Sequence, residues 1–405
     1  MILFEDALKK VLSRKIFIGS ERVALSDSIG RILAEDIFSD MDMPPFDKSA
    51  VDGYACRMSD ILPFSKISQD EIRTKKNSPL LVIETIPAGT IPKKTILPGQ
   101  CSKIMTGSMV PSGADCVIMV EDTEFADENL VWVNRYNTGK NICYRGEDIR
   151  SGDQVLPKGI QITPAHVAVL ASVGAINPLV AKLPRVGIIS TGDELVEPGD
   201  TPGTAQIRNS NALQMEAQVK IVPALPSYFG IALDDGPELR RIIDLAITNN
   251  DVLLITGGVS MGDFDFVPAI MQEAGFEILF NRIAIQPGKP TVFGCRNNTF
   301  IFGLAGNPVS SFVLFEMMVK PFLLRLMGYF SEPVVLKLPM GVDFSRRKSD
   351  RKSMIPVIMK EGAVFPVEYH GSAHINAYTI ANGIMVMEIG ATNINKGEQV
   401  NVRPL

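Results

Sequence analysis

Short apolar runs alternate with amphipathic stretches through the central part of this chain, between residues 182 and 328. The apolar runs predict strands at 185–190, 251–256, 276–280 and 300–304, and the amphipathic stretches predict helices at 211–219, 236–249, 267–274 and 309–327. Strands that alternate with helices pair in parallel and are covered by helices on both faces. The pattern therefore predicts a doubly wound α/β domain with a parallel sheet at residues 182–328.

The segments on either side of this domain have a different pattern. LLVIETI, CVIMVEDTEF and LVWVN lie between Pro, Gly and Asp turns, which predicts a β-rich domain at 45–140. Residues 329–405 carry β-type runs without a strong helical period, which predicts a small β-domain or barrel. Residues 1–44 begin as an amphipathic helix and become extended, whereas 141–181 hold a turn cluster and a helix that ends at Gly174.

The composition is that of an ordinary globular enzyme, with 46% hydrophobic and 21% charged residues over 405 positions. The net charge of -5 argues against a general nucleic-acid-binding protein. Charged residues interrupt the apolar N-terminus, so we expect no signal peptide, and Glu316, Lys320 and Arg325 make 309–327 a core helix rather than a membrane span. The five cysteines lack CxxC spacing, which predicts free thiols and a cytoplasmic protein.

Three of the predicted strands end in loops rich in glycine and small polar residues. These loops are STGDEL at 190–195, TGGVSMGDFD at 256–265 and LAGNPVSS at 304–311, and QPGKP at 286–290 adds Lys289. Because ligands of α/β sheets bind at the carboxyl ends of strands, the loops are expected to converge on one ligand. Backbone amides, carboxylates and a lysine suit a phosphorylated anion with a divalent cation. The alternative is that these loops use Gly, Asn and Pro only to form turns.

Eight motifs follow one another along nearly the whole chain. They are PPFDKSAVDGYA, KIMTGSMVPSGADCVIMVED, RGEDIRSGD, ISTGDEL, ITGGVSMGDFDF, QPGKP, GLAGNPVSS and HGSAHINAYTIANG. In this order they resemble the molybdopterin molybdenumtransferase family. The resemblance implies insertion of molybdate into adenylylated molybdopterin, with Mg²⁺, to give molybdenum cofactor and AMP.

The resemblance also implies an architecture and partners. The implied domains are a helical linker domain (1–44 with 141–181), a β-rich domain (45–140), an α/β domain that binds molybdopterin (182–328) and a C-terminal β-barrel (329–405). It implies a homodimer whose cleft is shared between subunits, and it raises molybdopterin adenylyltransferase and molybdoenzymes as protein partners. No nucleic acid or membrane is expected.

Family positions that match this chain imply roles for individual residues. The implied catalytic residues are Asp52, Thr106, Asp148, Glu194, Asp265 and Lys289. The implied ligand-binding residues are Thr191, Gly192, Asp193, Gly257, Gly258, Ser260, Gly306, Asn307, Pro308 and Ser372. The implied metal ligands are Asp193, Glu194 and Asp265. Asp52, Thr106 and Asp148 would come from the partner subunit, Lys289 would neutralise phosphate or molybdate, and Arg351 matches the family's arginine through a loose local alignment.

Two positions depart from the family's pattern. Gln286 stands where the family often has lysine, and Ala305 stands where it usually has proline. Neither change removes a carboxylate, so we expect catalysis to be retained. The alternatives are molybdopterin adenylyltransferase, whose fold resembles 182–328 alone, and a pterin-binding scaffold without turnover, for which Gln286 is the only support. The sequence does not separate molybdate from tungstate, since both are tetrahedral dianions of similar size.

Overall fold

The chain forms two compact units, each with its own core. The computed structural model describes residues 1–14, 18–61, 78–134, 139–233, 235–259, 267–330, 332–368, 371 and 373–405. The large unit comprises Met1–Glu35, Lys158–Val167 and Asn177–Leu405, and the small unit comprises Asp36–Pro157 and Ala168–Ile176. The predicted division into four domains stays a prediction.

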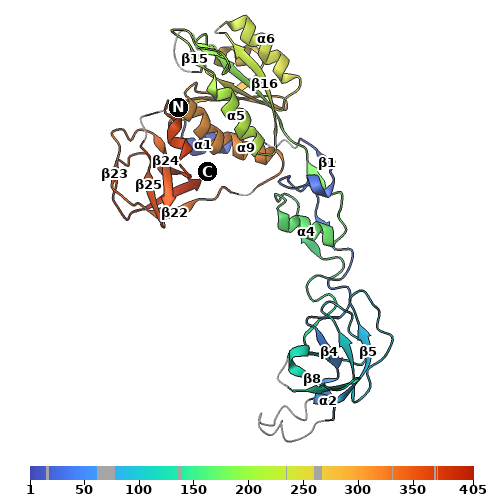
Figure 1. The fold of residues 1–405 in the computed structure, drawn as a ribbon. Coiled ribbons are helices and arrows are strands. Elements are labelled where there is room, and N and C mark those ends of the chain that lie inside the picture. Colours follow the sequence, from blue (N-terminus) through green and yellow to red (C-terminus); the bar gives the residue numbers. More distant parts are fainter. Residues whose placement is uncertain are drawn as a thin grey trace. The chain divides into compact units, whose positions relative to one another are not determined.

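A six-stranded sheet with the order β7-β4-β6-β5-β9-β8 forms the small unit (Figure 1). Its strands are β4 (Gly53–Cys56), β5 (Leu80–Ile86), β6 (Gln100–Ile104), β7 (Cys116–Met119), β8 (Thr123–Asp127) and β9 (Leu130–Val133). Around it lie β2 (Ile37–Phe38), β3 (Lys48–Ser49), α2 (Met58–Ile61), η3 (Val120–Asp122), β10 (Ile142–Cys143) and β11 (Gln154–Leu156). Tyr54, Cys101 and Ile118 are fully buried in its core. The β-rich character predicted for 45–140 is confirmed.

The large unit is built on a mixed six-stranded sheet with the order β16-β13-β17-β21-β20-β18. Its strands are β13 (Arg185–Thr191), β16 (Leu225–Ala232), β17 (Val252–Thr256), β18 (Glu277–Arg282), β20 (Pro290–Arg296) and β21 (Thr299–Leu304). The first four strands in this order are parallel, whereas β20 and β18 run antiparallel to their neighbours. The predicted α/β class is confirmed, but the prediction that the sheet is wholly parallel is wrong. The sequence prediction missed β16 and β20. Strand β20 pairs with β21 through a tight turn at Asn297, where φ is 52°.

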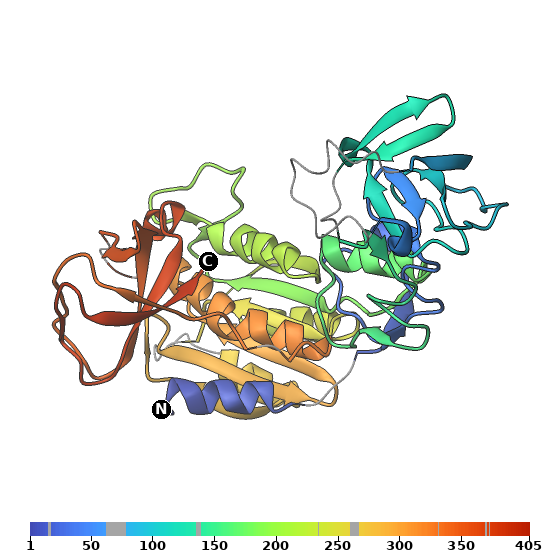
Figure 2. The same cartoon turned by 90° about the horizontal axis from the view of Figure 1, so that it is seen from below.

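Helices cover both faces of this sheet, as the alternating pattern predicts. They are α1 (Phe4–Leu12), α5 (Ser210–Ile221), α6 (Gly236–Ile247), α7 (Val267–Glu273), α8 (Pro308–Leu314) and α9 (Lys320–Leu326). One core lies under α1, α5, α8 and α9, and a second lies under α6 and α7. Figure 2 shows α1, in blue, near the orange helix that contains α8 and α9. In the first core Phe293 and Phe302 lie 4.7 Å apart between ring centroids, and each buried ring stabilises the fold by about 1.5–3 kcal/mol.

One continuous helix runs from the end of β21 to the C-terminal lobe. It passes from α8 through a π-helical segment, η4 (Phe315–Val319), into α9. Asn307 is its N-cap residue and Pro308 its first helical residue, although the Asn307 side chain makes no capping hydrogen bond. The proline at 321 has no amide hydrogen to donate to the turn before it, which is where the π-helical segment lies. The helix ends before Gly328, which has φ of 84°.

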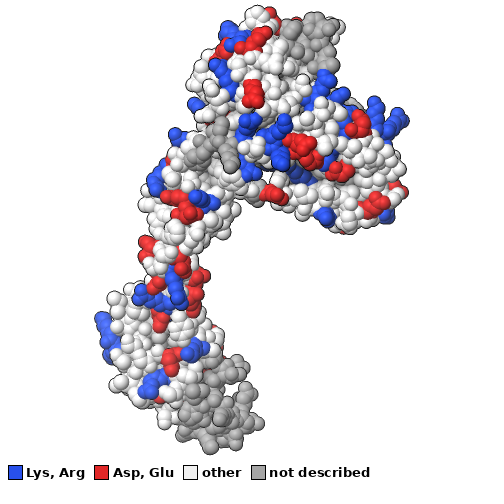
Figure 3. Space-filling view, turned by 180° about the vertical axis from the view of Figure 1, so that it is seen from behind, with Lys and Arg blue, Asp and Glu red and all other residues white. Residues whose placement is uncertain are grey.

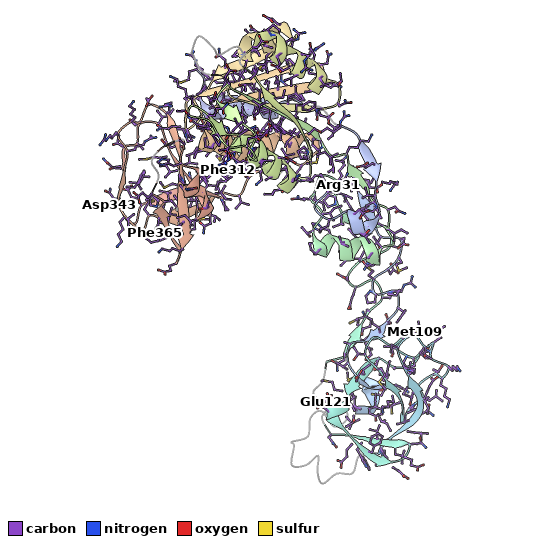
Figure 4. The ribbon with its side chains drawn as sticks, turned by 45° about the horizontal axis from the view of Figure 1, so that its top comes forward. Arg31, Met109, Glu121, Phe312, Asp343 and Phe365 are labelled. Atoms are coloured by element: carbon purple, nitrogen blue, oxygen red, sulfur yellow. The ribbon has the colours of Figure 1, made fainter. Side chains whose placement is uncertain are left out.

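The C-terminal lobe is a small closed set of strands, which confirms the β-rich tail. Its sheet has the order β19-β24-β26-β28-β22, with β25 also paired to β24. The strands are β19 (Ile285–Gln286), β22 (Leu336–Pro339), β24 (Lys352–Lys360), β25 (Ala363–Pro366), β26 (Gly383–Met387) and β28 (Gln399–Pro404). A bridge between Met340 and Val364 joins the end of β22 back to β25 and closes the ring. In Figure 4, Asp343 and Phe365 mark this lobe. The rings of Phe312 and Tyr378 lie 4.8 Å apart between centroids.

Several short elements complete the described structure. They are β1 (Ser20–Arg22), η1 (Leu25–Asp27), α4 (Pro164–Ser172), β12 (Leu179–Ala181), β14 (Leu195–Val196), β15 (Ile207–Arg208), β23 (Phe344–Ser345), η5 (Ile375–Thr379) and β27 (Asn393–Ile394). Among the residues described, no helix is both long enough and apolar enough to cross a membrane.

Candidate functional site

A cavity of about 390 Å³ lies where the strands β13, β17 and β21 end. Its lining brings together the three predicted loops, and the residues from them are Thr191, Gly192, Glu194, Leu195, Thr256, Gly257, Gly258, Val259, Ala305, Gly306 and Asn307. The convergence follows from the parallel pairing of these strands, because parallel strands place their carboxyl ends at one edge. Pro308 begins α8 beside the cavity, and Asp193 is exposed on the first of the three loops.

Glycine is required where two of these loops touch. Gly257 has φ of 95°, and a Cβ there would lie 2.4 Å from the Thr191 carbonyl oxygen. A Cβ on Gly306 would lie 3.5 Å from the Gly257 Cα, so the second and third loops also run close together. Backbone replaces side chains along this wall, which lets a ligand approach the peptide groups directly.

The Glu194 carboxylate folds back over Gly192. A Cβ on Gly192 would lie 2.5 Å from the Glu194 Oε2 atom, so this space is taken by the carboxylate. The structure thus places one acidic group on the cavity wall, next to Asp193 in the sequence. Across the described ranges, no three His, Cys, Asp or Glu side chains group to hold a metal ion. Oxygen donors nevertheless suit Mg²⁺, which keeps several waters and needs only one or two protein carboxylates beside substrate phosphates.

Asn211 is a cavity residue that the sequence did not single out. Its Nδ2 donates to the Thr256 Oγ1 at 2.9 Å and to the Gly306 carbonyl oxygen at 2.6 Å. The side chain is only 9% exposed, and its Oδ1 has no partner in the structure described. A signal was present, because polar residues cluster at 209–211 where the predicted helix begins. Asn209 caps that helix by accepting from the Ala212 amide.

Two apolar residues of the cavity lining lie on the short β14–β15 pair. Leu195 and Ile207 both line the cavity, and Ile207 is 57% exposed. The site therefore combines a polar backbone wall with an apolar one, as ligand cavities commonly do.

A second cavity, of about 440 Å³, adjoins the first, and cationic side chains form part of its lining. It shares Pro290, Ala305 and Asn307 with the first cavity, and it is also lined by Lys289 and Arg351. Strand β19 pairs with β24 of the C-terminal lobe just before this loop, which fixes the loop between the sheet and the lobe. Within the described chain the Lys289 ammonium has no ion pair. This arrangement suits an anion.

Asp52 and Thr106, from two different motifs, meet in the small unit. The Thr106 amide donates to the Asp52 Oδ1 at 2.6 Å and the Thr106 hydroxyl donates to the same atom at 2.7 Å. The amide hydrogen bond, and then the hydroxyl hydrogen bond, lower the pKa of the Asp52 carboxyl. Asp148 is exposed in the turn after β10, where its amide donates to the Met43 carbonyl oxygen. Met109 and Glu121 mark this unit in Figure 4.

Comparison with known proteins identifies the family. Three family models match in order: the MoeA N-terminal region (domain I and II) at 2–174, a probable molybdopterin binding domain at 187–325, and the MoeA C-terminal region (domain IV) at 337–405. A molybdopterin molybdenumtransferase of Bacillus subtilis (strain 168) is 35% identical over 98% of this chain and 93% of its own length. The chain belongs to the molybdopterin molybdenumtransferase family.

Further members agree with this assignment. A molybdopterin molybdenumtransferase of Staphylococcus epidermidis is 33% identical over 99% of this chain and 95% of its own length. The crystal structure of a molybdopterin biosynthesis moea protein from Pyrococcus horikoshii matches with a TM-score of 0.80 at 31% identity, covering 100% of this chain and 99% of that one. Curated relatives are thus transferases by name, and the predicted family is confirmed.

Within this molybdopterin molybdenumtransferase family member, the structure leaves some predicted site residues undescribed. Ser260, Asp265 and Ser372 lie outside the described residues. Both departures from the family's pattern line the basic cavity, since Gln286 and Ala305 lie there together. The roles assigned to individual site residues stay predictions.

Proposed function

We propose that this family member inserts molybdate into adenylylated molybdopterin, releasing AMP and forming molybdenum cofactor with Mg²⁺. The observation that carries the proposal is the pair of adjoining cavities, one walled by glycine backbone and one by Lys289 and Arg351. They share Pro290, Ala305 and Asn307, so ligands in the two cavities would be neighbours. A reaction that joins two anions needs such an arrangement.

The first cavity would hold the adenylylated pterin. Backbone around Gly257, Gly258 and Gly306 comes close to the ligand, and its amides suit phosphate oxygens. The exposed apolar side chain of Ile207 in the same lining offers a surface for the flat pterin ring. Ser260, predicted to donate its hydroxyl, belongs to the same loop in the sequence.

The second cavity would hold the oxyanion. Molybdate is a dianion, and the neighbouring phosphates would repel it unless cations lie between them. Lys289 and Arg351 supply two positive charges at this wall. Holding both reactants side by side replaces a bimolecular encounter, an effect that contributes about 7–11 kcal/mol in well-oriented reactions.

Asp193 and Glu194, with Asp265, would hold the divalent cation. When bound, Mg²⁺ would screen phosphate charge and polarise the bond to the departing AMP. The carboxylates of this chain would then hold the cation and orient the ligand. No protein nucleophile is needed, because the pterin's own sulfur atoms bind the metal that is inserted.

Homodimerisation in the cytoplasm completes the proposal. Asp52, Thr106 and Asp148 would reach the cleft from the second subunit, with Asp52 held as a charged carboxylate by Thr106. The dimer is testable by sedimentation at micromolar concentration, and a monomer that is fully active would overturn the shared cleft.

The deciding experiment mixes purified protein with adenylylated molybdopterin, Mg²⁺ and a low concentration of molybdate. AMP release that depends on molybdate, together with cofactor formation, is the expected result. Tight pterin binding without AMP release would show a scaffold instead. Consumption of ATP and free molybdopterin would show an adenylyltransferase. The same assay with tungstate in place of molybdate defines the preferred oxyanion.

A further inference from the structure

A third cavity, of about 400 Å³, opens in the C-terminal lobe next to the basic cavity. It shares Gln286, Pro287 and Arg351 with that cavity, so the Arg351 side chain lines both. The remaining lining residues are Phe344, Arg346, Arg347, Lys348, Ser353, Met354 and Ile355. Figure 3 shows Lys and Arg side chains on this lobe, several of them beside Asp or Glu.

Arg346 serves the architecture of this cavity rather than a ligand. Its Nε donates to the Ala391 carbonyl oxygen at 2.7 Å and its Nη1 to the Arg351 carbonyl oxygen at 2.8 Å. Its Nη1 also donates to the Ser353 hydroxyl. These bonds fix the loop that follows β23, and burial lowers the pKa of the Arg346 guanidinium.

Arg347 and Lys348, by contrast, have no fixed partner. Both are exposed, and among the described residues neither makes an ion pair. The neighbouring acids are already used, since Asp350 pairs with Arg351 at 3.4 Å and Glu388 pairs with Lys352 at 3.0 Å. The loop therefore presents two unneutralised positive charges at the cavity.

The rest of the lining offers an anion few free donors, because the Arg346 guanidinium is committed to Ala391, Arg351 and Ser353. Phe344, Met354 and Ile355 are apolar, and the wall shared with the basic cavity carries the neutral amide of Gln286. Two exposed cations beside apolar side chains attract an anion without immobilising it. The shared Arg351, which also pairs with Asp350 at 3.4 Å, is the lining cation that this cavity has in common with the cavity of Lys289.

We propose that this third cavity is an antechamber that collects a small tetrahedral oxyanion and passes it by way of Arg351 to the basic cavity. The inference rests on the proposed function, because it gives that reaction's inorganic substrate a route. Cations that line the approach to a site raise local anion concentration and capture rates by about 10–1,000-fold at low salt. Arg347 and Lys348 would act on capture and would leave the reaction of bound substrate unchanged.

The test compares Arg347→Gln/Lys348→Gln with a matched control, Lys337→Gln/Lys396→Gln. The control removes the same charge from exposed positions of the same lobe that do not line the cavity. Initial rates of AMP release are measured against molybdate concentration at low and at physiological salt. The first variant is expected to raise the KM for molybdate about tenfold at low salt, less at physiological salt, with kcat unchanged. The control is expected to match the wild-type protein.

Calorimetry with molybdate alone gives a readout that needs no turnover. It should show weaker molybdate binding in Arg347→Gln/Lys348→Gln than in the control. If the wild-type protein releases no AMP, the proposed function fails, while calorimetry still tests whether the third cavity collects molybdate. Equal KM values in both variants, or a fall in kcat, would overturn the inference. A rise in the KM for the adenylylated pterin instead would assign the cavity to the nucleotide and would also overturn it.

Discussion

The Asn211 side chain holds the Gly306 carbonyl oxygen at 2.6 Å, and it thereby ties the start of α5 to the loop after β21. The same Nδ2 reaches the Thr256 hydroxyl at the end of β17. One buried amide thus fixes two of the three loops that line the glycine-rich cavity. Because the Asn211 side chain contacts both loops from α5, it helps to set the distance between them.

Asn211→Ala is expected to weaken binding of the adenylylated pterin and to lower stability. The Gly306 carbonyl oxygen and the Thr256 hydroxyl would each lose a buried partner, and such a loss costs about 1–3 kcal/mol. Titration of the pterin and chemical denaturation measure the two effects. Pterin affinity equal to that of the wild-type protein would show that Asn211 does not position the loops.

Asn250→Ala separates the local effect from a general loss of stability. Asn250 is also buried, and its Nδ2 donates to the Ala246 carbonyl oxygen at 2.9 Å, but it lies before the opposite end of β17. This variant should unfold more easily and bind the pterin normally. Equal losses of pterin affinity in both variants would point to global destabilisation as the cause.

Gly257→Ala is expected to destroy the cavity wall. The added methyl group would lie 2.4 Å from the Thr191 carbonyl oxygen, and φ is 95°. Gly230→Ala is the matched control, since Gly230 has φ of 91° but no atom within 4 Å of an added Cβ. The control carries only the backbone strain, about 1–2 kcal/mol. A thermal melt and pterin titration of both variants decide this, and similar behaviour of the two would refute the steric argument.

The sequence predicted the α/β layer because β13, β17 and β21 are short apolar runs followed by polar glycine loops. It missed β16, whose run LPSYFGIA is broken by proline and glycine, and it missed β20, which begins at Pro290 within the motif QPGKP, where proline and glycine indicate a loop. The turn at Asn297 could have indicated a hairpin, but the apolar run before it begins inside the QPGKP motif and was therefore interpreted as a loop. The strand's direction follows from that turn, because a tight connection joins antiparallel neighbours.

The site was only partly predictable for a similar reason. Gly257 and Gly306 stand in recognisable loops, and their meeting follows from the parallel pairing of β17 with β21. The role of Asn211 depends on a helix packing against the sheet, a long-range contact with no fixed spacing in the sequence. The third cavity depends likewise on how the C-terminal lobe folds around Arg346.

Thiol alkylation should distinguish two classes of cysteine in the native protein. Cys56, Cys101 and Cys116 are buried, and the Sγ atoms of Cys56 and Cys116 lie 3.6 Å apart on paired strands. The hydrogen bond between the Cys56 and Cys116 thiols, and then burial, raise the pKa of the Cys56 thiol, and burial raises the pKa of Cys101 to about 12. Because a reagent must reach the sulfur atom, the half-buried Cys143 and Cys295 should be modified first. Early labelling of Cys101, read by mass spectrometry, would contradict the packing of the small unit.

The pKa of Asp52 should rise in Thr106→Val but stay below its ordinary value. The variant loses the hydroxyl donor and keeps the amide donor, which is the larger cause of the lowering. Since the folded-state pKa is depressed, this carboxylate stabilises the fold above its unfolded pKa, and that contribution disappears as the pH falls toward the folded pKa. Carboxyl-carbon NMR titration measures the shift, with Thr123→Val as a control elsewhere in the small unit. An unchanged Asp52 pKa in Thr106→Val would show that the hydroxyl contributes nothing.

Gln286→Lys tests whether the missing charge matters to the oxyanion. The position lines both the basic cavity and the third cavity, so a lysine would add a cation to the lining that also carries Arg351 and Lys289. Two unit charges 4 Å apart attract by about 1 kcal/mol in water and more where water is partly excluded, so molybdate affinity should rise at least about fivefold. Gln272→Lys, an exposed position on α7, adds the same charge outside both cavities and should leave affinity unchanged. If calorimetry shows equal molybdate affinity in both variants and the wild-type protein, the anion does not lie beside Gln286, and the assignment of the basic cavity is wrong.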